Sequence, residues 1–163
     1  MSSLAPLEFS CLPFEALDPY RLYTLLRLRV DVFVVEQSCA YPDLDGHDHA
    51  PGVRHLLGER AGQLLAAARL LPPGLSFDTP AIGRVVVAAS ARGLGLAHLL
   101  MRTAIAQCEQ LWPGQDQNLS AQAHLQGFYA AHGFVACSEP YLEDGIPHVG
   151  MRRSVALPSW TAG

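Results

Sequence analysis

The sequence lacks the features that mark several special classes of protein. No apolar run approaches the ~18 residues that a transmembrane helix needs, and residues 1–8 have neither the basic flank nor the long apolar segment of a signal peptide. The four cysteines are far apart and form no CxxC pair, which favours buried free thiols over a zinc or redox site. We therefore expect a cytoplasmic protein with no membrane partner and no metal.

Composition and charge indicate one globular domain. The chain has 163 residues, of which 50% are hydrophobic and 16% are charged. One core fits this length, so we expect a single domain over residues 1–163 with its core at about 7–156. The net charge of −4 excludes a general attraction to nucleic acid or to anionic membranes. An anionic ligand would therefore be held locally, by backbone dipoles and a few arginines.

The spacing of apolar residues and chain breakers predicts a mixture of strands and helices. Asp18 and Pro19 are typical of a helix start, and the continuous apolar run at 82–87 predicts a strand buried on both faces. The order β-α-β-β-β-α-β-α-β-β indicates a mixed α/β fold and argues against a doubly wound nucleotide fold. The predicted strands are 7–11, 55–60, 63–71, 82–87, 118–121, 134–138 and 146–155, and the predicted helices are 20–35, 93–111 and 122–132.

The strongest local signal is a glycine-containing turn between a predicted strand and a predicted helix. Val85, Val86 and Val87 end the strand, and the run Arg92-Gly93-Leu94-Gly95-Leu96-Ala97 leads into the helix. The two glycines let backbone N–H groups approach a ligand closely, and the positive end of the helix dipole favours phosphate. A Walker loop would need Gly-Lys-Ser/Thr, and a dinucleotide fingerprint would need a third glycine and an acidic ribose partner; neither is present. The other alternative is a turn that binds no ligand.

Two motifs resemble those of the GNAT superfamily of N-acetyltransferases. Arg92-x-x-Gly95-x-Ala97 is similar to the Q/R-x-x-G-x-G/A motif, and Phe128-Tyr129-Ala130-Ala131-His132-Gly133-Phe134 is similar to the (L/F)Y-x-x-x-G-F segment. The resemblance implies a mostly antiparallel mixed sheet with helices on both faces and acetyl-CoA as cosubstrate, but it does not indicate the acceptor. Stretches that resemble the ElaA-like branch, over about Leu22 to Val155, are 29–37, 41–46, 121–126 and 143–148.

The resemblance also implies roles for single residues. The strand 82–87 would pair with the pantetheine arm of the cofactor, the loop amides would bind its pyrophosphate, and a backbone N–H near Val87, where the strand bulges, would stabilise the oxyanion. Tyr129 falls on the general-acid position for the leaving thiolate, with packing under the sheet as its alternative role. Gln122 stands where many relatives have an asparagine that contacts the pantetheine arm. His124 is either a further ligand contact or a helix-surface residue.

Glu36 and His148 are candidates for the base that removes a proton from the acceptor amine. Such a base is useful because an amine with a pKa near ~10.4 is mostly protonated at neutral pH. Glu36 ends the predicted first helix, where a solvated carboxylate is equally expected. His148 follows the predicted turn at Asp144-Gly145.

Acidic residues gather in two predicted loops. We expect the segment 43–48 and the Glu143-Asp144 turn to form an acidic lip that attracts a cationic amine. The spacing in 43–48 lacks an EF-hand pattern and disfavours a metal site. Arg69 and Arg84 either pair with these acids or reach cofactor phosphates.

The sequence thus predicts an enzyme that transfers acetyl from acetyl-CoA to an amine of a small molecule or peptide by direct attack in a ternary complex. We expect no covalent intermediate, because Cys108 and Cys137 fall in predicted core elements. A non-catalytic acyl-CoA-binding or sensing module is the alternative, and it would need neither the tyrosine nor the acidic lip. A related acyltransferase that uses a longer acyl chain is a third hypothesis. A homodimer is a further expectation from the resemblance.

Overall fold

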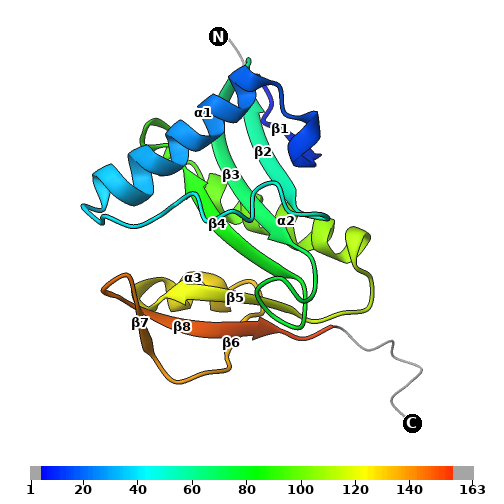
Figure 1. Cartoon of the computed structure of the whole chain (residues 1–163), viewed down its shortest axis with the longest axis vertical. Helices are drawn as coiled ribbons and strands as arrows, with labels where there is room; N and C mark the ends of the chain where they lie inside the picture. Colours follow the sequence, from blue (N-terminus) through cyan, green and yellow to red (C-terminus); the bar gives the residue numbers. More distant parts are fainter. Residues whose placement is uncertain (1–4, 156–163) are drawn as a thin grey trace.

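The computed structural model describes residues 5–155, and these contain one eight-stranded sheet (Figure 1). The sheet order is β1-β2-β3-β4-β5-β8-β6, with β7 paired to β8; in this part of the chain only β4 and β5 are parallel neighbours. This confirms the expected mixed, mostly antiparallel sheet, while the single domain over 1–163 stays a prediction that extends beyond the described residues. The strands are β1 (Glu8–Leu12), β2 (Arg54–Arg60), β3 (Gln63–Leu71), β4 (Ala81–Val87), β5 (Gln117–Gln122), β6 (Val135–Ala136), β7 (Tyr141–Glu143) and β8 (Ile146–Arg153).

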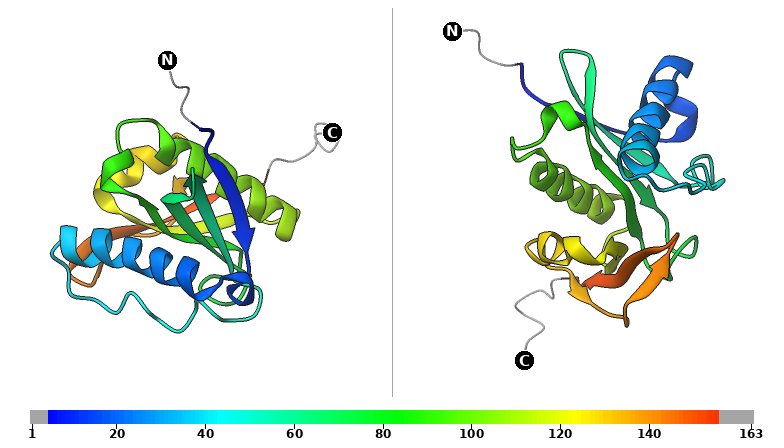
Figure 2. Two further views of the ribbon diagram at one scale, coloured as in Figure 1. Left: turned by 90° about the horizontal axis from the view of Figure 1, so that it is seen from above. Right: turned by 90° about the vertical axis from the view of Figure 1, so that its left-hand side faces the viewer.

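Helices cover both faces of the sheet, as predicted. Helix α1 (Pro19–Arg29) lies on one face, and α2 (Leu96–Leu111) and α3 (Gln126–Ala130) lie on the other (Figure 2). Because side chains alternate along a strand, Leu56 of β2 packs with residues of α2 and α3, whereas Leu57 packs with residues of α1. Two apolar clusters on opposite faces thus hold the layers together.

The first helix begins as predicted but changes its hydrogen-bond pattern before its end. Asp18 accepts a hydrogen bond from the Arg21 amide at 2.9 Å, which caps α1. After Arg29 the chain continues as a π-helical segment, Val30–Glu36, labelled η2. This wider turn rotates the last side chains, so Val35 is 66% exposed and the prediction of one apolar stripe to residue 35 is wrong at its end.

The hairpin of β2 and β3 is confirmed, but several other predicted boundaries are wrong. Helix α2 begins three residues later than predicted, because Gly93 and Gly95 adopt left-handed φ angles of +82° and +74°. Gln122 ends β5 and does not begin a helix; a 3₁₀ turn, Ala123–Leu125, precedes the short α3. The predicted strand 134–138 shrinks to β6, and β7 was not predicted at all.

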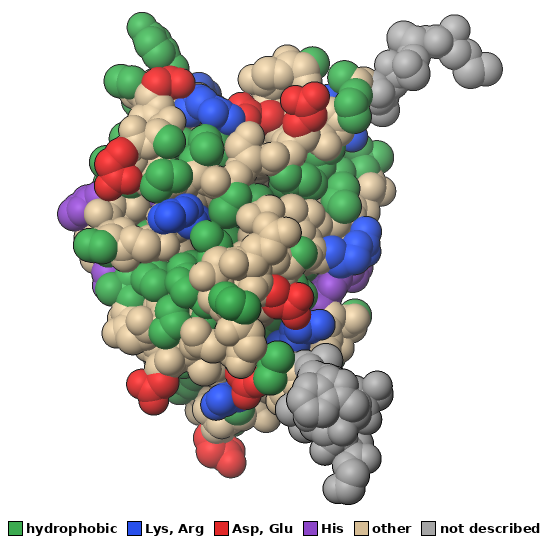
Figure 3. Space-filling model, turned by 90° about the vertical axis from the view of Figure 1, so that its right-hand side faces the viewer, with side chains coloured by type: hydrophobic (Ala, Val, Ile, Leu, Met, Phe, Trp, Pro, Cys, Tyr) green, Lys and Arg blue, Asp and Glu red, His purple; other side chains and the backbone are tan. Residues whose placement is uncertain are grey.

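The surface carries mixed charge where it is visible in Figure 3. On that face, arginine and acidic side chains are interspersed with hydrophobic ones. Within the described part of the chain, no helix has both the length and the apolar character to cross a membrane.

Candidate functional site

A cavity opens where β4 and β5 separate. Within the described residues, the two strands share one register pair, Ala81 with Asn118, and they diverge beyond it (Figure 1). The Asn118 amide donates to the Pro80 carbonyl at 2.9 Å, which fixes the joined end. The cavity has a volume of about 590 Å³ and is lined by both strands. Ile82 and Val86 are buried in the clusters on opposite faces of the sheet, as predicted for 82–87, while the edge of β4 toward β5 is open to this cavity.

The strand β4 bulges beside the cavity, shortly before the position near Val87 that the family resemblance implied. Ala67 pairs with Val86 and Arg69 with Gly83, so β4 contains one residue more than β3 between these pairs. Arg84 lies within the bulge and has a left-handed φ of +48°. The bulge thus precedes Val87, which pairs regularly with β3, and it directs backbone groups between 84 and 86 away from the ladder.

The glycine loop at the mouth of the cavity fits a phosphate group. A Cβ atom added to Gly93 or Gly95 would meet no atom of the described residues within 4 Å, so the space above the backbone is open. In this part of the chain no side chain caps α2, which leaves the amides of its first turn free for a ligand. Leu96 anchors the turn in the core, Leu94 is exposed, and Ala97 lines the cavity.

Arg92 and Glu36, which were predicted for different roles, bind each other. The guanidinium of Arg92 makes two hydrogen bonds to the Glu36 carboxylate, one of them at 2.8 Å, and two longer ones to the Val87 carbonyl. The hydrogen bonds from Arg92 lower the pKa of Glu36. Both side chains remain more than 40% exposed. The ion pair therefore joins the end of η2 to the glycine loop while staying open to solvent.

Tyr129 and Gln122 both line the cavity, whereas His124 does not. Tyr129 is buried, and this burial raises its pKa to about 12, so its hydroxyl stays protonated at neutral pH. Its neighbour Phe128 packs edge-on against it, with ring centroids 5.0 Å apart. The Gln122 amide donates to Gln37 at 3.2 Å and so links the end of β5 to the loop after η2.

His148 lines the cavity beside Gln122, its partner across β5 and β8, and has a defined tautomer. Its Nδ1 is 2.7 Å from the Ile146 carbonyl, which can only accept, so Nδ1 carries a proton. Its Nε2 is 3.3 Å from Oε2 of Glu143, and its ring stacks on Tyr141 at 6.1 Å. In the neutral ring the lone pair is therefore on Nε2, the nitrogen beside the Glu143 carboxylate.

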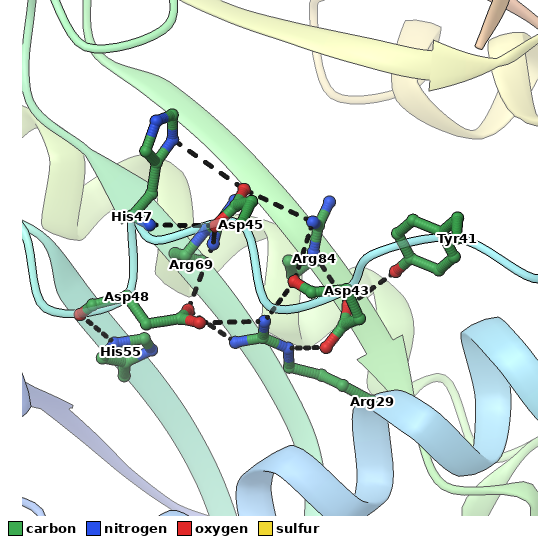
Figure 4. A network of polar contacts seen from close by, with 9 residues as sticks. All are labelled: Arg29, Tyr41, Asp43, Asp45, His47, Asp48, His55, Arg69 and Arg84. Carbon is green, nitrogen blue, oxygen red and sulfur yellow. Dashed lines mark hydrogen bonds and ion pairs between the residues drawn. The ribbon is translucent and has the colours of Figure 1, made fainter. Parts of the chain in front are cut away.

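A buried network of arginines and aspartates replaces the expected acidic lip (Figure 4). Arg29, at the end of α1, donates to Asp43 at 2.9 Å and to Asp48 at 2.7 Å. Its side chain is 1% exposed. Three positive and three negative charges balance in the network, so the prediction of an acidic lip at 43–48 is wrong. The members are Arg29, Asp43, Asp45, Asp48, Arg69 and Arg84.

The network also decides the roles of Arg69 and Arg84, which the sequence left open. Arg69 binds Asp45 through both terminal nitrogens, at 2.8 and 2.7 Å. Burial raises the pKa of Asp45, but the hydrogen bonds from Arg69 and other donors outweigh it, so the net pKa is lowered. The pKa of Asp48 is also lowered: burial raises it, but the hydrogen bonds and charges of the arginines, chiefly Arg29, outweigh that effect.

Among residues 5–155, no three His, Cys, Asp or Glu side chains are arranged to hold a metal ion.

Sequence reasoning missed Arg29 because it lies in the predicted helix, among apolar residues. The signal that could have revealed it was a single arginine on the buried side of that helix, followed by a loop with several aspartates.

Of the two cysteines that were predicted to lie in core elements, only one is buried. Cys108 is buried and its pKa is raised to about 12 by that burial, whereas Cys137 is exposed and follows β6.

Comparison with known proteins places the chain in a family. The sequence pattern of the acetyltransferase (GNAT) domain matches residues 36–155. Protein ElaA of Escherichia coli (strain K12) is 44% identical over 149 residues, which cover 91% of this chain and 97% of ElaA. An acyl-CoA N-acyltransferase from Pseudomonas aeruginosa has a TM-score of 0.87 at 50% identity, over 91% of this chain and 100% of that one. The crystal structure of E. coli ElaA has a TM-score of 0.86 at 42% identity, with the same coverage of 91% and 100%. The chain therefore belongs to the GNAT family of acyltransferases.

Proposed function

We propose that this acyltransferase moves acetyl from acetyl-CoA to an amine of a small molecule or peptide, by direct attack in a ternary complex. One observation carries the proposal: a single cavity connects the glycine loop with Tyr129 and His148. One bound thioester and one amine could thus reach three groups of the protein: the free amides of the glycine loop, the protonated hydroxyl of Tyr129 and the lone pair of His148.

The cosubstrate site would be built largely from backbone. Acetyl-CoA supplies an activated thioester and an arm that contains amide groups. The cavity side of β4 offers N–H and C=O groups that could bond such an arm as a neighbouring strand would. The free amides of Gly95 to Ala97 are suited to the pyrophosphate. A backbone N–H between the bulge and Val87 would donate to the thioester oxygen as negative charge develops there.

We favour His148 over Glu36 as the base. His148 lines the cavity, and with the proton on Nδ1 the lone pair of Nε2 could take the amine proton beside the Glu143 carboxylate. Glu36 is a weaker candidate, because Arg92 lowers its pKa and occupies its oxygens. In this reading Glu36 acts as the partner of Arg92.

Tyr129 would assist the departing thiolate mainly as a hydrogen-bond donor. Its pKa of about 12 lies above the ~8.5 of a thiol, so complete proton transfer from the phenol to a thiolate is unfavourable. Hydrogen bonding to a developing charge still stabilises it. The effect on rate should therefore be modest.

The test measures CoA binding by calorimetry and CoA release from acetyl-CoA with a panel of amines. We expect release with at least one class of amine, and a large loss of kcat in His148→Gln with CoA affinity retained. The chain contains no lysine, so release without added amine cannot come from acetylation of its own lysine side chains. CoA binding without release for any amine would instead support the sensing module, and faster release from longer acyl-CoAs would support the third hypothesis.

A further inference from the structure

Arg84 combines an unusual backbone conformation with a place on the cavity wall. It lies in the bulge of β4, and its φ of +48° is unfavourable for a residue with a long side chain. Arg84 is also three residues before Val87, about 10 Å along the strand from the end that leads to the glycine loop. This separation, together with its bonds to the aspartates, argues against a role in holding the pyrophosphate.

The guanidinium of Arg84 is held in place through only part of its donor set. Nη2 donates to the Asp43 carbonyl at 3.0 Å and contacts Asp45 at 3.4 Å, and Nε lies 3.0 Å from the Asp43 carboxylate. The Tyr41 ring lies against the group, 5.3 Å from its centre. None of these contacts uses Nη1, for which residues 5–155 provide no partner. In Figure 4 this remaining nitrogen points away from the aspartates.

We infer that the acceptor carries a carboxylate as well as an amine, and that Arg84 binds this carboxylate. The inference rests on the proposed function. An immobilised guanidinium with two unused N–H donors on Nη1 is prepared for an anionic oxygen and needs little ordering when it binds one. The acceptor is then a small amino acid or a related amino-carboxylate.

The charges around the cavity agree with such a zwitterion. The network around Arg84 has no net charge, so a carboxylate there meets no excess of acid. On the other wall, Glu143 is half exposed and lies beside His148, which suits an ammonium group that must lose a proton. An acceptor with two amines would instead place one positive charge against Arg84.

The experiment measures CoA release from acetyl-CoA with a series of small amino acids as acceptors. Each amino acid is compared with the amine that lacks its carboxylate. For the wild type we expect kcat/KM to be at least about tenfold higher for the carboxylate-containing partner. In Arg84→Gln this ratio should fall at least about tenfold, and Arg84→Lys should restore it only in part, because lysine keeps the charge but loses the fork. Arg102→Gln is the matched control: this exposed arginine of α2 does not line the cavity, so the ratio should not change.

The outcomes separate this inference from the proposed function. A wild type that uses decarboxylated amines as well as amino acids would overturn the inference and leave the acetyltransferase proposal intact. An unchanged ratio in Arg84→Gln would overturn it as well. If Arg84→Gln does not fold, the wild-type preference and the Arg84→Lys ratio decide. The absence of CoA release with every amine would instead count against the proposed function.

Discussion

Arginine–carboxylate contacts occur in two places near the cavity with opposite surroundings. In the buried network, Arg29 and Asp43 have side chains that are 1% and 3% exposed, and Arg29 also binds a second aspartate. At the glycine loop, Arg92 and Glu36 form a single pair in which both side chains are more than 40% exposed. Both places pair an arginine with a carboxylate, but their exposure to water differs greatly.

Because of this difference, the ion pairs of the buried network form a fixed region, whereas the ion pair at the glycine loop can exchange its partners. The buried charges of the network have lost their water, so they depend on their partners and hold the loop 37–53 on the sheet; they are Arg29, Asp43, Asp48 and Arg69. The Arg92 pair keeps its water and can change partners at little cost. We therefore expect changes at Arg29 and its aspartates to alter unfolding, and changes around the open loop to alter ligand binding or turnover.

The largest effect is expected for Arg29→Met. It would leave two buried carboxylates without their main donor, and we expect a loss of about 3–5 kcal/mol in the free energy of unfolding. Urea denaturation is the measurement. The control is Arg27→Met on the same helix, whose side chain is 73% exposed and 3.7 Å from Asp31. Equal stability of the two variants would contradict the division into two regions.

Gly95→Glu tests the open region. Its side chain would enter the space above the loop with a negative charge, and CoA affinity should fall about a hundredfold or more. Gly95→Ala is the control. It places a side chain at the same left-handed φ, but this side chain lacks the bulk and the charge of glutamate. Calorimetry on both folded variants is decisive. If they bind CoA equally well, the phosphate lies elsewhere.

Acid should weaken the network, by less than the removal of Arg29 does. The pKa of Asp48 is lowered in the folded state, so its stabilising contribution is complete above the unfolded value of ~3.9 and is lost as pH falls below it. We expect the free energy of unfolding to decrease below about pH 4. The decrease should be shallower in Asp48→Asn, and parallel curves for the two proteins would argue against this role of Asp48.

Tyr129→Phe should lower kcat about tenfold and leave CoA affinity unchanged. The substitution removes one oxygen and keeps the ring that packs against Phe128. Single-turnover kinetics with a good acceptor give the chemical step directly. Tyr20→Phe, at a side chain that is 85% exposed, controls for the loss of a hydroxyl. Equal rates for Tyr129→Phe and the wild type would reduce Tyr129 to a packing residue.

The smallest effect is expected for Glu36→Gln. It would release Arg92 for the cofactor, so CoA affinity should rise about two- to fivefold while the unfolding midpoint stays constant. Glu109→Gln breaks another exposed arginine pair, with Arg153, and should change neither quantity. Weaker CoA binding in Glu36→Gln would mean that Glu36 positions Arg92 for the phosphate, and the pair would then belong to the fixed region.

Local sequence determined much of the fold and the outline of the site. Asp18 and Pro19 start α1 because a capping oxygen and a fixed φ act within one turn of the chain. Gly93 and Gly95 allow the left-handed turn before α2 for an equally local reason. The tyrosine of the motif at 128–134 falls on the cavity wall because helix geometry sets its direction from its neighbour. These features depend on backbone angles and side-chain spacing, which a short stretch of sequence contains.

Only the tertiary structure decided which charges meet and where the ligand space opens. Arg29 binds aspartates 14 and 19 residues away, and Arg92 binds a glutamate 56 residues away. The clustering of acidic residues in the sequence suggested an acidic lip, because the sign of each charge is local whereas its neutralisation depends on distance in space. The separation of β4 from β5 and the bulge at Arg84 likewise arise from the pairing of whole strands. Register and packing are properties of many residues together, so no motif in the chain encodes them by itself.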